Sequence, residues 1–140
     1  MVHLISVITL VMIFLFILPA KAQDSSLISF DLEDQFDQKY TDEDFDGQII
    51  ILVGSDKEGS QYNERWSVAI HDSLKARGLQ DSVTFLAVAN VKGVPRLFRG
   101  MVKGRFPRDH GQSILLDWKG LFAESYQFQP DVSKLLLFDR

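Results

Sequence analysis

Apolar residues along the chain gather in short runs that are separated by polar and glycine-containing stretches. Residues 48–53 (QIIILV) are too few for a helix and rich in β-branched side chains, so they predict a strand buried on both faces of a sheet. Residues 83–88 (VTFLAV) predict a second strand of the same kind. Residues 113–116 and 134–138 are further strand candidates, and residues 29–32 predict a short edge strand.

One longer stretch between the two buried strands has helical periodicity. Apolar side chains recur at helical spacing in residues 61–77, Ser60 precedes them as the predicted N-cap, and Gly78 follows their end. A strand, a helix and a strand in this order predict a right-handed crossover between parallel strands, and therefore an α/β fold. Residues 90–111 contain four glycines and two prolines, which predicts a loop with a short helix at residues 96–102.

The first residues form a separate apolar segment. Residues 4–18 are continuously apolar but fewer than the ~20 residues of a membrane-spanning helix, and a small-x-small site (Ala20, Lys21, Ala22) follows them. This pattern predicts a cleaved signal peptide at residues 1–22, a mature protein that starts at Gln23, and export to the periplasm or the medium. An uncleaved membrane anchor is the alternative. Residues 23–140 then form one domain, which is large enough for a single core.

Amino-acid composition excludes several kinds of site from the exported domain. The chain has 140 residues, with 15 lysines and arginines, 19 aspartates and glutamates, and no cysteine. Loss of Lys21 with the signal peptide leaves 14 basic residues against the same 19 acidic ones, a net charge of −5. Without cysteine the domain forms no disulfide, zinc ribbon or c-type haem attachment, and it has no thiol nucleophile. We expect no cofactor and no metal.

Residues near both ends of the mature chain resemble a known superfamily. Residues 30–35 (FDLEDQ) and 45–47 (FDG) precede the first buried strand, and residues 115–126 (LLDWKGLFAESY) and 136–139 (LLFD) lie near the end. Their order and spacing resemble the redoxin and peroxiredoxin branch of the thioredoxin superfamily, and most of all its exported, cysteine-free YtfJ-like group. The resemblance implies a thioredoxin-like fold with a mixed central sheet flanked by helices, here lacking the family's last strand and C-terminal helix.

The same resemblance implies that thiol redox chemistry is lost. Redox-active relatives carry a cysteine where the loop after the first core strand enters the helix, because unpaired N–H groups there stabilise a thiolate. Here residues 55–61 read SDKEGSQ, and Ser133 stands where those relatives have a proline before a late strand. We therefore expect a redox-inactive binding or structural module. An enzyme that uses polar groups near Ser60, and a shortened gene product with little function, are the alternatives.

A basic segment and the start of the long helix together form the candidate ligand site. From Lys92 to Arg108 the chain has six basic residues and no acidic one, and a helix start offers backbone N–H groups to an anion. An anionic ligand or a protein partner is therefore expected, with no nucleic acid, and with no membrane contact after signal removal. The candidate residues are Ser55, Gly59, Ser60, Gln61, Asn63, Arg96, Arg99 and Arg105.

Three partial motifs each lack a feature that their chemistry requires. The sequence from Asp42 to Gly47 matches the first half of a calcium-binding EF-hand loop, but the second half is apolar, which favours an acidic turn. Residues 54–60 imitate a phosphate-binding loop without its lysine. His71 lies about three helical turns, ~16 Å, from Ser60 and is too distant to act as its base. No catalytic residue is predicted.

Two further predictions concern how apolar side chains pack. Trp66 and Trp118 are expected to lie in or beside the core, as large aromatic side chains usually do. Residues 134–138 resemble the penultimate strand of a thioredoxin-like sheet, so they are expected at an open edge with one face uncovered. Because unpaired edges associate with other chains, this strand predicts self-association or poor solubility.

Overall fold

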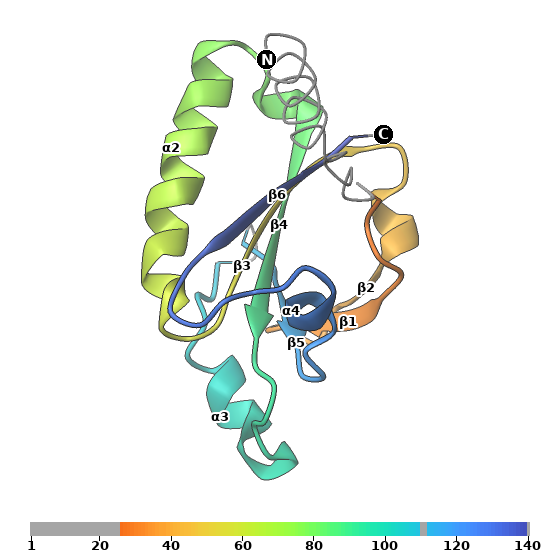
Figure 1. The fold of residues 1–140 in the computed structure, drawn as a ribbon, viewed down its shortest axis with the longest axis vertical. Helices are drawn as coiled ribbons and strands as arrows, with labels where there is room; N and C mark the ends of the chain where they lie inside the picture. Colours follow the sequence, from red (N-terminus) through yellow and green to blue (C-terminus); the bar gives the residue numbers. More distant parts are fainter. Residues whose placement is uncertain (1–25, 110–111, 140) are drawn as a thin grey trace, which may run out of the picture.

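The computed structural model describes residues 26–109 and 112–139, and the predicted signal peptide at residues 1–22 lies outside them. Six strands form one mixed sheet in the order β2-β1-β5-β4-β3-β6, with helices beside it (Figure 1). The predicted α/β class is therefore confirmed. Within the described part of the chain, no helix is long and apolar enough to cross a membrane.

The centre of the sheet contains the predicted parallel crossover. Strand β3 (Ile49–Ser55) pairs in parallel with β4 (Val83–Asn90), and helix α2 (Asn63–Ala76) connects them. Strand β5 (Ile114–Asp117) continues the parallel part on the other side of β4. Central parallel strands tend to be apolar on both faces, as β3 and β4 are. The prediction that both strands are buried on both faces was wrong for β4, where Phe85 is 37% exposed.

Antiparallel strands complete both sides of the sheet. Strand β1 (Asp31–Asp34) pairs with β2 (Lys39–Thr41) and with β5, while β6 (Lys134–Phe138) pairs with β3. The prediction of an edge strand at residues 29–32 was wrong in position. The strand lies two residues later and inside the sheet, because β2 adds a further strand outside it.

Helix α2 begins later than the sequence pattern predicts. A 3₁₀ helix, η2 (Gly59–Tyr62), precedes α2, so Tyr62 and not Ser60 is the N-cap residue of α2. The hydroxyl of Ser60 donates a hydrogen bond to the carbonyl oxygen of Lys57 at 2.6 Å and is therefore turned back into the loop. The predicted N-cap was wrong because the extra 3₁₀ turn carries the chain into the helix without a side-chain cap.

Shorter helices follow β4 and β5. The predicted short helix is confirmed as η4 (Arg96–Phe98) followed directly by α3 (Arg99–Lys103). Helix α4 (Leu121–Ser125) begins after Asp117, whose carboxylate accepts hydrogen bonds from the backbone N–H groups of Leu121 and Phe122, each at 2.8 Å. Two more 3₁₀ helices, η1 (Asp42–Phe45) and η3 (Gln80–Ser82), precede β3 and β4.

The main core lies on the face of the sheet that α4 covers (Figure 1). Phe122 of α4 is fully buried, and its ring lies 5.1 Å from that of Phe30 in an edge-to-face contact. Side chains from five strands complete this cluster, so the core holds β1, the parallel strands and β6 together. The strand residues in it are Leu32, Ile50, Leu52, Leu86, Val88, Leu115 and Phe138.

The opposite face is covered less completely. Helix α2 contacts this face through Asn63 and Ser55, yet no residue of α2 is buried and Trp66 is 50% exposed. The prediction that Trp66 packs in the core was therefore wrong: the helix is too loosely seated to bury it. Leu137 of β6, which alternation places on this same face, is 65% exposed.

Candidate functional site

The loop between β3 and α2 is closed by a network of three polar side chains. The side-chain amide of Asn63 donates a hydrogen bond to the hydroxyl oxygen of Ser55 at 2.9 Å. The hydroxyl of Ser133 donates to the side-chain oxygen of the same Asn63. Ser55 is 1% exposed, so these bonds satisfy a polar group that has no access to water. The network joins the end of β3, the start of α2 and the entry to β6.

Two glycines of this loop lie against other parts of the chain. A Cβ atom on Gly59 would lie 2.7 Å from the carbonyl carbon of Val132 and 2.9 Å from its amide nitrogen. A Cβ atom on Gly54 would overlap the ring of Phe128. Both distances are below van der Waals contact, so the sequence needs glycine at these positions for packing rather than for contact with a phosphate.

Acidic groups surround the start of α2. The carboxylate of Asp56 accepts hydrogen bonds from the backbone N–H of Gly59 at 2.7 Å and from that of Asp131 at 3.1 Å, which links the two loops. Carboxylate oxygens of Asp56, Glu58 and Asp131 lie within 4.8 Å of one another, a spacing that could hold a metal ion. Three negative charges here oppose an anion at the helix start.

The two remaining candidates at the helix start are directed into the loop. Besides the bond from Ser60 to Lys57, the side-chain amide of Gln61 donates to the carbonyl oxygen of Glu58 at 2.8 Å. His71 lies further along α2, where its Nδ1 atom is 3.8 Å from the carboxylate of Asp72. Within the described contacts, Ser60 has no base that could activate it as a nucleophile.

A second site lies beside β1, β2 and β5, where basic side chains from four segments surround a hollow of about 500 Å³. The guanidinium carbon of Arg99 lies 4.6 Å from the centroid of the Trp118 ring, a cation–π contact that fixes the orientation of the arginine. We call this site the basic hollow. It is lined by Lys39, Arg96, Arg99, Trp118 and Lys119, with Asp31, Leu32, Glu33 and Leu116.

The carboxylate of Glu33 is paired with a lysine from outside the basic hollow. Lys103 of α3 forms ion pairs with Glu33, at 2.8 Å, and with Asp37. Burial lowers the pKa of Lys103, but the hydrogen bonds to Asp37 and Glu33 outweigh burial and hold the pKa above its ordinary value. Lys103 is therefore charged at neutral pH. The lining of the basic hollow then has four cations against the carboxylates of Asp31 and Glu33, and Lys103 shares its one charge between Glu33 and Asp37.

The predicted ligand residues thus divide into two groups. Ser55, Gly59 and Asn63 belong to the closed loop, whereas Arg96 and Arg99 line the basic hollow, whose lining includes no residue from the helix start. Arg105 follows α3 as an exposed residue. Seven of the nine lining residues were not predicted from the sequence, among them Lys39, Trp118 and Lys119. The tryptophan and lysine directly after β5 are a local signal for Trp118 and Lys119, whereas Lys39 has none.

No protein-family profile matches the chain, and no curated protein is detectably similar to it in sequence. Solved structures do match. A putative thiol-disulfide oxidoreductase from Bacteroides vulgatus is 16% identical, with 88% of this chain and 77% of that one covered and a TM-score of 0.54. A putative thiol:disulfide interchange protein DsbE from Chlorobium tepidum is 17% identical, with 81% and 74% covered and a TM-score of 0.51.

A third similar structure is the exposed lipoprotein thioredoxin Etrx1 of Streptococcus pneumoniae, which is 20% identical over 81% of this chain and 90% of that one, with a TM-score of 0.50. These likenesses in structure show that the chain has a thioredoxin-like fold, as the sequence resemblance implied. At such low sequence identity, these likenesses show a shared fold and nothing about activity. The finer likeness to the YtfJ-like group stays a prediction.

Proposed function

We propose that the chain is an exported, thioredoxin-like binding domain without thiol redox activity, and that it binds a small anionic ligand in the basic hollow. The observation that carries the proposal is the convergence of four cationic side chains on one hollow, with the guanidinium of Arg99 stacked on Trp118. The apolar N-terminal run and the small-x-small site support export.

The redox part of the proposal depends on chemistry that needs a thiolate. Thiol-disulfide exchange proceeds by attack of a thiolate on a disulfide, and the chain has no cysteine among its 140 residues. The loop where related folds would carry one is filled by the Ser55–Asn63–Ser133 network and by the contact of Gly59 with Val132. These contacts give the loop a structural role.

The anion part depends on the geometry of arginine. A guanidinium group presents a planar set of N–H donors that matches a carboxylate or a phosphate in two parallel hydrogen bonds. Stacking on Trp118 holds Arg99 in one orientation, so less side-chain entropy is lost when a ligand binds. Lys39 and Lys119 add charge from the far side of the basic hollow, where exact geometry matters less.

The structure gives the enzyme alternative no supporting observation, since the hydroxyl of Ser60 is bonded to a backbone carbonyl. The helix start is also a poor anion site because Asp56, Glu58 and Asp131 lie beside it. We therefore place the ligand in the basic hollow and not in the combined site that the sequence predicted.

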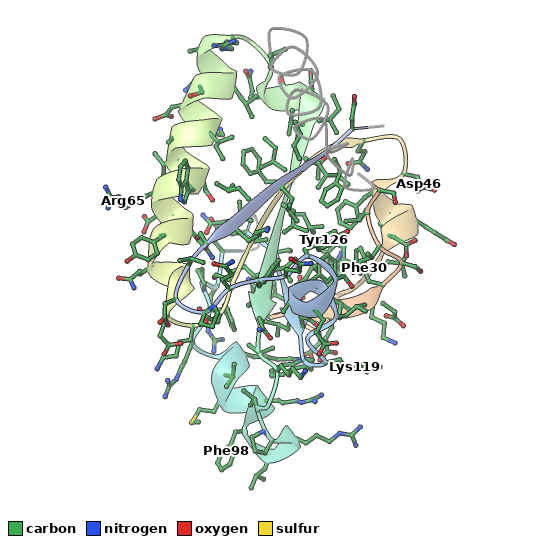
Figure 2. All side chains as sticks on the ribbon, in the orientation of Figure 1. Phe30, Asp46, Arg65, Phe98, Lys119 and Tyr126 are labelled. Atoms are coloured by element: carbon green, nitrogen blue, oxygen red, sulfur yellow. The ribbon has the colours of Figure 1, made fainter. Side chains whose placement is uncertain are left out.

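Calorimetric titration of the purified protein with inorganic phosphate and with sulfate at low salt tests this proposal. We expect weak binding that falls as salt is added, because exposed charges are screened over about 8 Å at physiological ionic strength. Substitution Arg96→Gln should weaken binding about tenfold, the value of one charged hydrogen bond. Arg65→Gln on α2 is the matched control, since Figure 2 shows Arg65 far from Lys119.

Two results would contradict the proposal. If neither anion binds at low salt, or if Arg65→Gln weakens binding as much as Arg96→Gln, the basic hollow is not the site. A protein-dependent rate of insulin reduction, measured in the same preparation with dithiothreitol, would exclude the redox-inactive half of the proposal.

A further inference from the structure

The segment formed by η4 and α3 ends in an apolar tip. Leu97 is 87% exposed, Met101 is 56% exposed and Phe98 is 47% exposed, so three large apolar side chains lie within five consecutive positions. Figure 1 shows α3 projecting from the sheet at one end of the long axis, and Figure 2 shows Phe98 at that end. Exposed apolar groups gathered in this way mark an interaction surface.

Basic residues flank the apolar tip in the sequence; by the apolar tip we mean Leu97, Phe98 and Met101. No acidic residue occurs from Lys92 to Arg108, and four arginines lie in that segment. Arg96 and Arg99 reach the basic hollow, while Arg105 and Arg108 are exposed beyond α3. Apolar side chains that share a segment with several cations are complementary to a surface that is apolar within and negatively charged outside.

The shape of the tip decides between two such surfaces. A peptide partner is normally held in a groove, where it buries its side chains on both sides. The tip is instead convex and projects away from the rest of the structure (Figure 1). A convex apolar group can enter the interfacial layer of a bilayer, where its side chains meet acyl chains and its cations meet lipid phosphates.

We propose that the apolar tip docks on an anionic lipid surface, with Leu97 and Phe98 entering the interface and a lipid phosphate bound in the basic hollow. The proposal rests on the proposed function, since it names the source of the anion. It replaces the sequence-based expectation of no membrane contact. That expectation rested on removal of the apolar N-terminal segment and could not foresee that the apolar side chains of η4 and α3 would be left exposed.

Net charge does not oppose this orientation. The chain carries −4 overall, but at physiological ionic strength charges act over only about 8 Å, so the local charge at the tip decides the contact. The acidic turn that contains Asp46 lies towards the opposite end of the long axis from Phe98 (Figure 2). A membrane that meets the tip therefore meets the basic segment from Lys92 to Arg108, in which Lys103 is already paired with Glu33 and Asp37.

Vesicle co-sedimentation tests the proposal with protein purified from the exported fraction. Vesicles of phosphatidylcholine alone are compared with vesicles in which part of it is replaced by phosphatidylglycerol. We expect binding only to the second kind. The double variant Leu97→Ser/Phe98→Ser should lose at least about tenfold in vesicle affinity through lost apolar burial. Arg96→Gln should lose about fivefold, since one basic residue near a lipid surface contributes on that scale.

Matched controls separate the tip from other parts of the chain. Val68→Ser removes an apolar side chain of similar exposure on α2 and should bind vesicles as the parent does. A second measurement locates the contact: the fluorescence that Phe98→Trp adds to that of the parent, which contains Trp66 and Trp118, should be quenched by brominated lipids. The fluorescence that Tyr62→Trp on η2 adds to that of the parent should not be quenched. This readout is independent of any lipid contact made by the N-terminal segment.

The outcomes distinguish this inference from the proposed function. If the double tip variant still binds inorganic phosphate but loses vesicles, both proposals stand. If the parent binds phosphate but sediments equally with both kinds of vesicle, or if the Phe98→Trp fluorescence is not quenched, the lipid proposal is overturned and the anion site stands. If phosphate fails to bind, the proposed function is overturned.

Discussion

Gly59 at the entry to η2 lies in direct backbone contact with Val132, which precedes β6. The two residues are 73 positions apart in the chain, and no side chain fits between them. The contact fixes the distance between the loop after β3 and the loop before β6. It also brings Ser133 within reach of Asn63, so the polar network depends on the absence of a side chain at Gly59.

Substitution Gly59→Ala should therefore lower the free energy of unfolding by about 1–3 kcal/mol, because the added methyl group overlaps backbone atoms that cannot move independently. Gly100→Ala is the matched control. It lies in α3 with no atom within 4 Å of the added Cβ, and it should be neutral or stabilising by up to about 1 kcal/mol. Urea unfolding of both variants makes the comparison, and equal stabilities would show that the loops are not packed as described.

Removal of Asn63 should also destabilise the domain. Asn63→Ala leaves the buried hydroxyl of Ser55 without its donor and that of Ser133 without its main acceptor, which should cost about 1–3 kcal/mol. Ser73→Ala on the same helix removes an exposed hydroxyl and should change stability by less than about 0.5 kcal/mol. Thermal unfolding followed by circular dichroism measures both, and a neutral Asn63→Ala would mean that the network contributes nothing.

The stability of the acidic turn should depend on pH through Asp42. The backbone N–H of Phe30 donates to its carboxylate at 3.0 Å, and the hydroxyl of Ser29 donates at 3.1 Å. The first of these bonds is the main reason why the pKa of Asp42 lies below its ordinary value. A lowered pKa in the folded state gives stabilisation that is present above the unfolded pKa, about 3.9, and is lost as the pH falls through the folded value.

Asp42→Asn should therefore unfold more easily than the parent at neutral pH, and the difference should disappear as the pH falls below about 4. Glu43→Gln changes a neighbouring exposed side chain and serves as the control at each pH. Chemical unfolding across this pH range measures the difference directly. A difference that grows towards low pH would have the wrong sign and would contradict the role given to Asp42.

The sequence predicts well those strands that are buried, because their residues are mostly apolar. Residues 48–53, 83–88 and 134–138 are apolar because β3, β4 and β6 each have at least one face against the core, so local composition and tertiary position agree. The parallel pairing of β3 with β4 followed from the strand, helix and strand pattern. The short helix after β4 followed from glycine and proline spacing.

The elements that sequence analysis missed depend on contacts between distant residues. Strand β2 has three residues, and its turn is set by the carboxylate of Asp34, which accepts the backbone N–H groups of Phe36 at 2.8 Å and Gln38 at 3.0 Å. Asp37 in this turn has a positive φ of 67°. The local apolar pattern does not predict this turn, because the turn is built by the hydrogen bonds of one buried polar side chain, that of Asp34.

The candidate site also combines residues that local sequence predicts with residues that only the folded sheet brings together. Arg96 and Arg99 could be proposed from charge alone, since they belong to one continuous basic segment. Lys39 reaches the basic hollow only because β2 pairs with β1, and Trp118 only because β5 pairs with β1 on the other side. A site assembled across three strands depends on register, which single-chain patterns do not contain.

Strand β6 occupies the end of the sheet order and pairs with β3, and among the described strands none pairs with its other side. The predicted edge position is thus confirmed, and the unpaired backbone groups of β6 can accept a further strand. A second copy could pair its own β6 in the antiparallel direction about a two-fold axis, which would cover both edges at once. Leu137 would then lie next to the same strand of the partner instead of in water.

Leu137→Lys should reduce this association, because a lysine on an edge strand must lose water when another strand pairs beside it. We expect the parent to show an apparent mass that rises with concentration in light scattering, and the variant to stay closer to one chain. Leu79→Lys removes an apolar side chain that is also exposed but lies outside the sheet, so it should associate like the parent. A parent that is a single chain at every concentration, or two variants that associate equally, would show that the edge of β6 is not used. In that case the exposure of Leu137 would not be explained by a partner strand. The position of β6 would be unaffected, because its pairing with β3 from Lys134 to Phe138 involves no second copy.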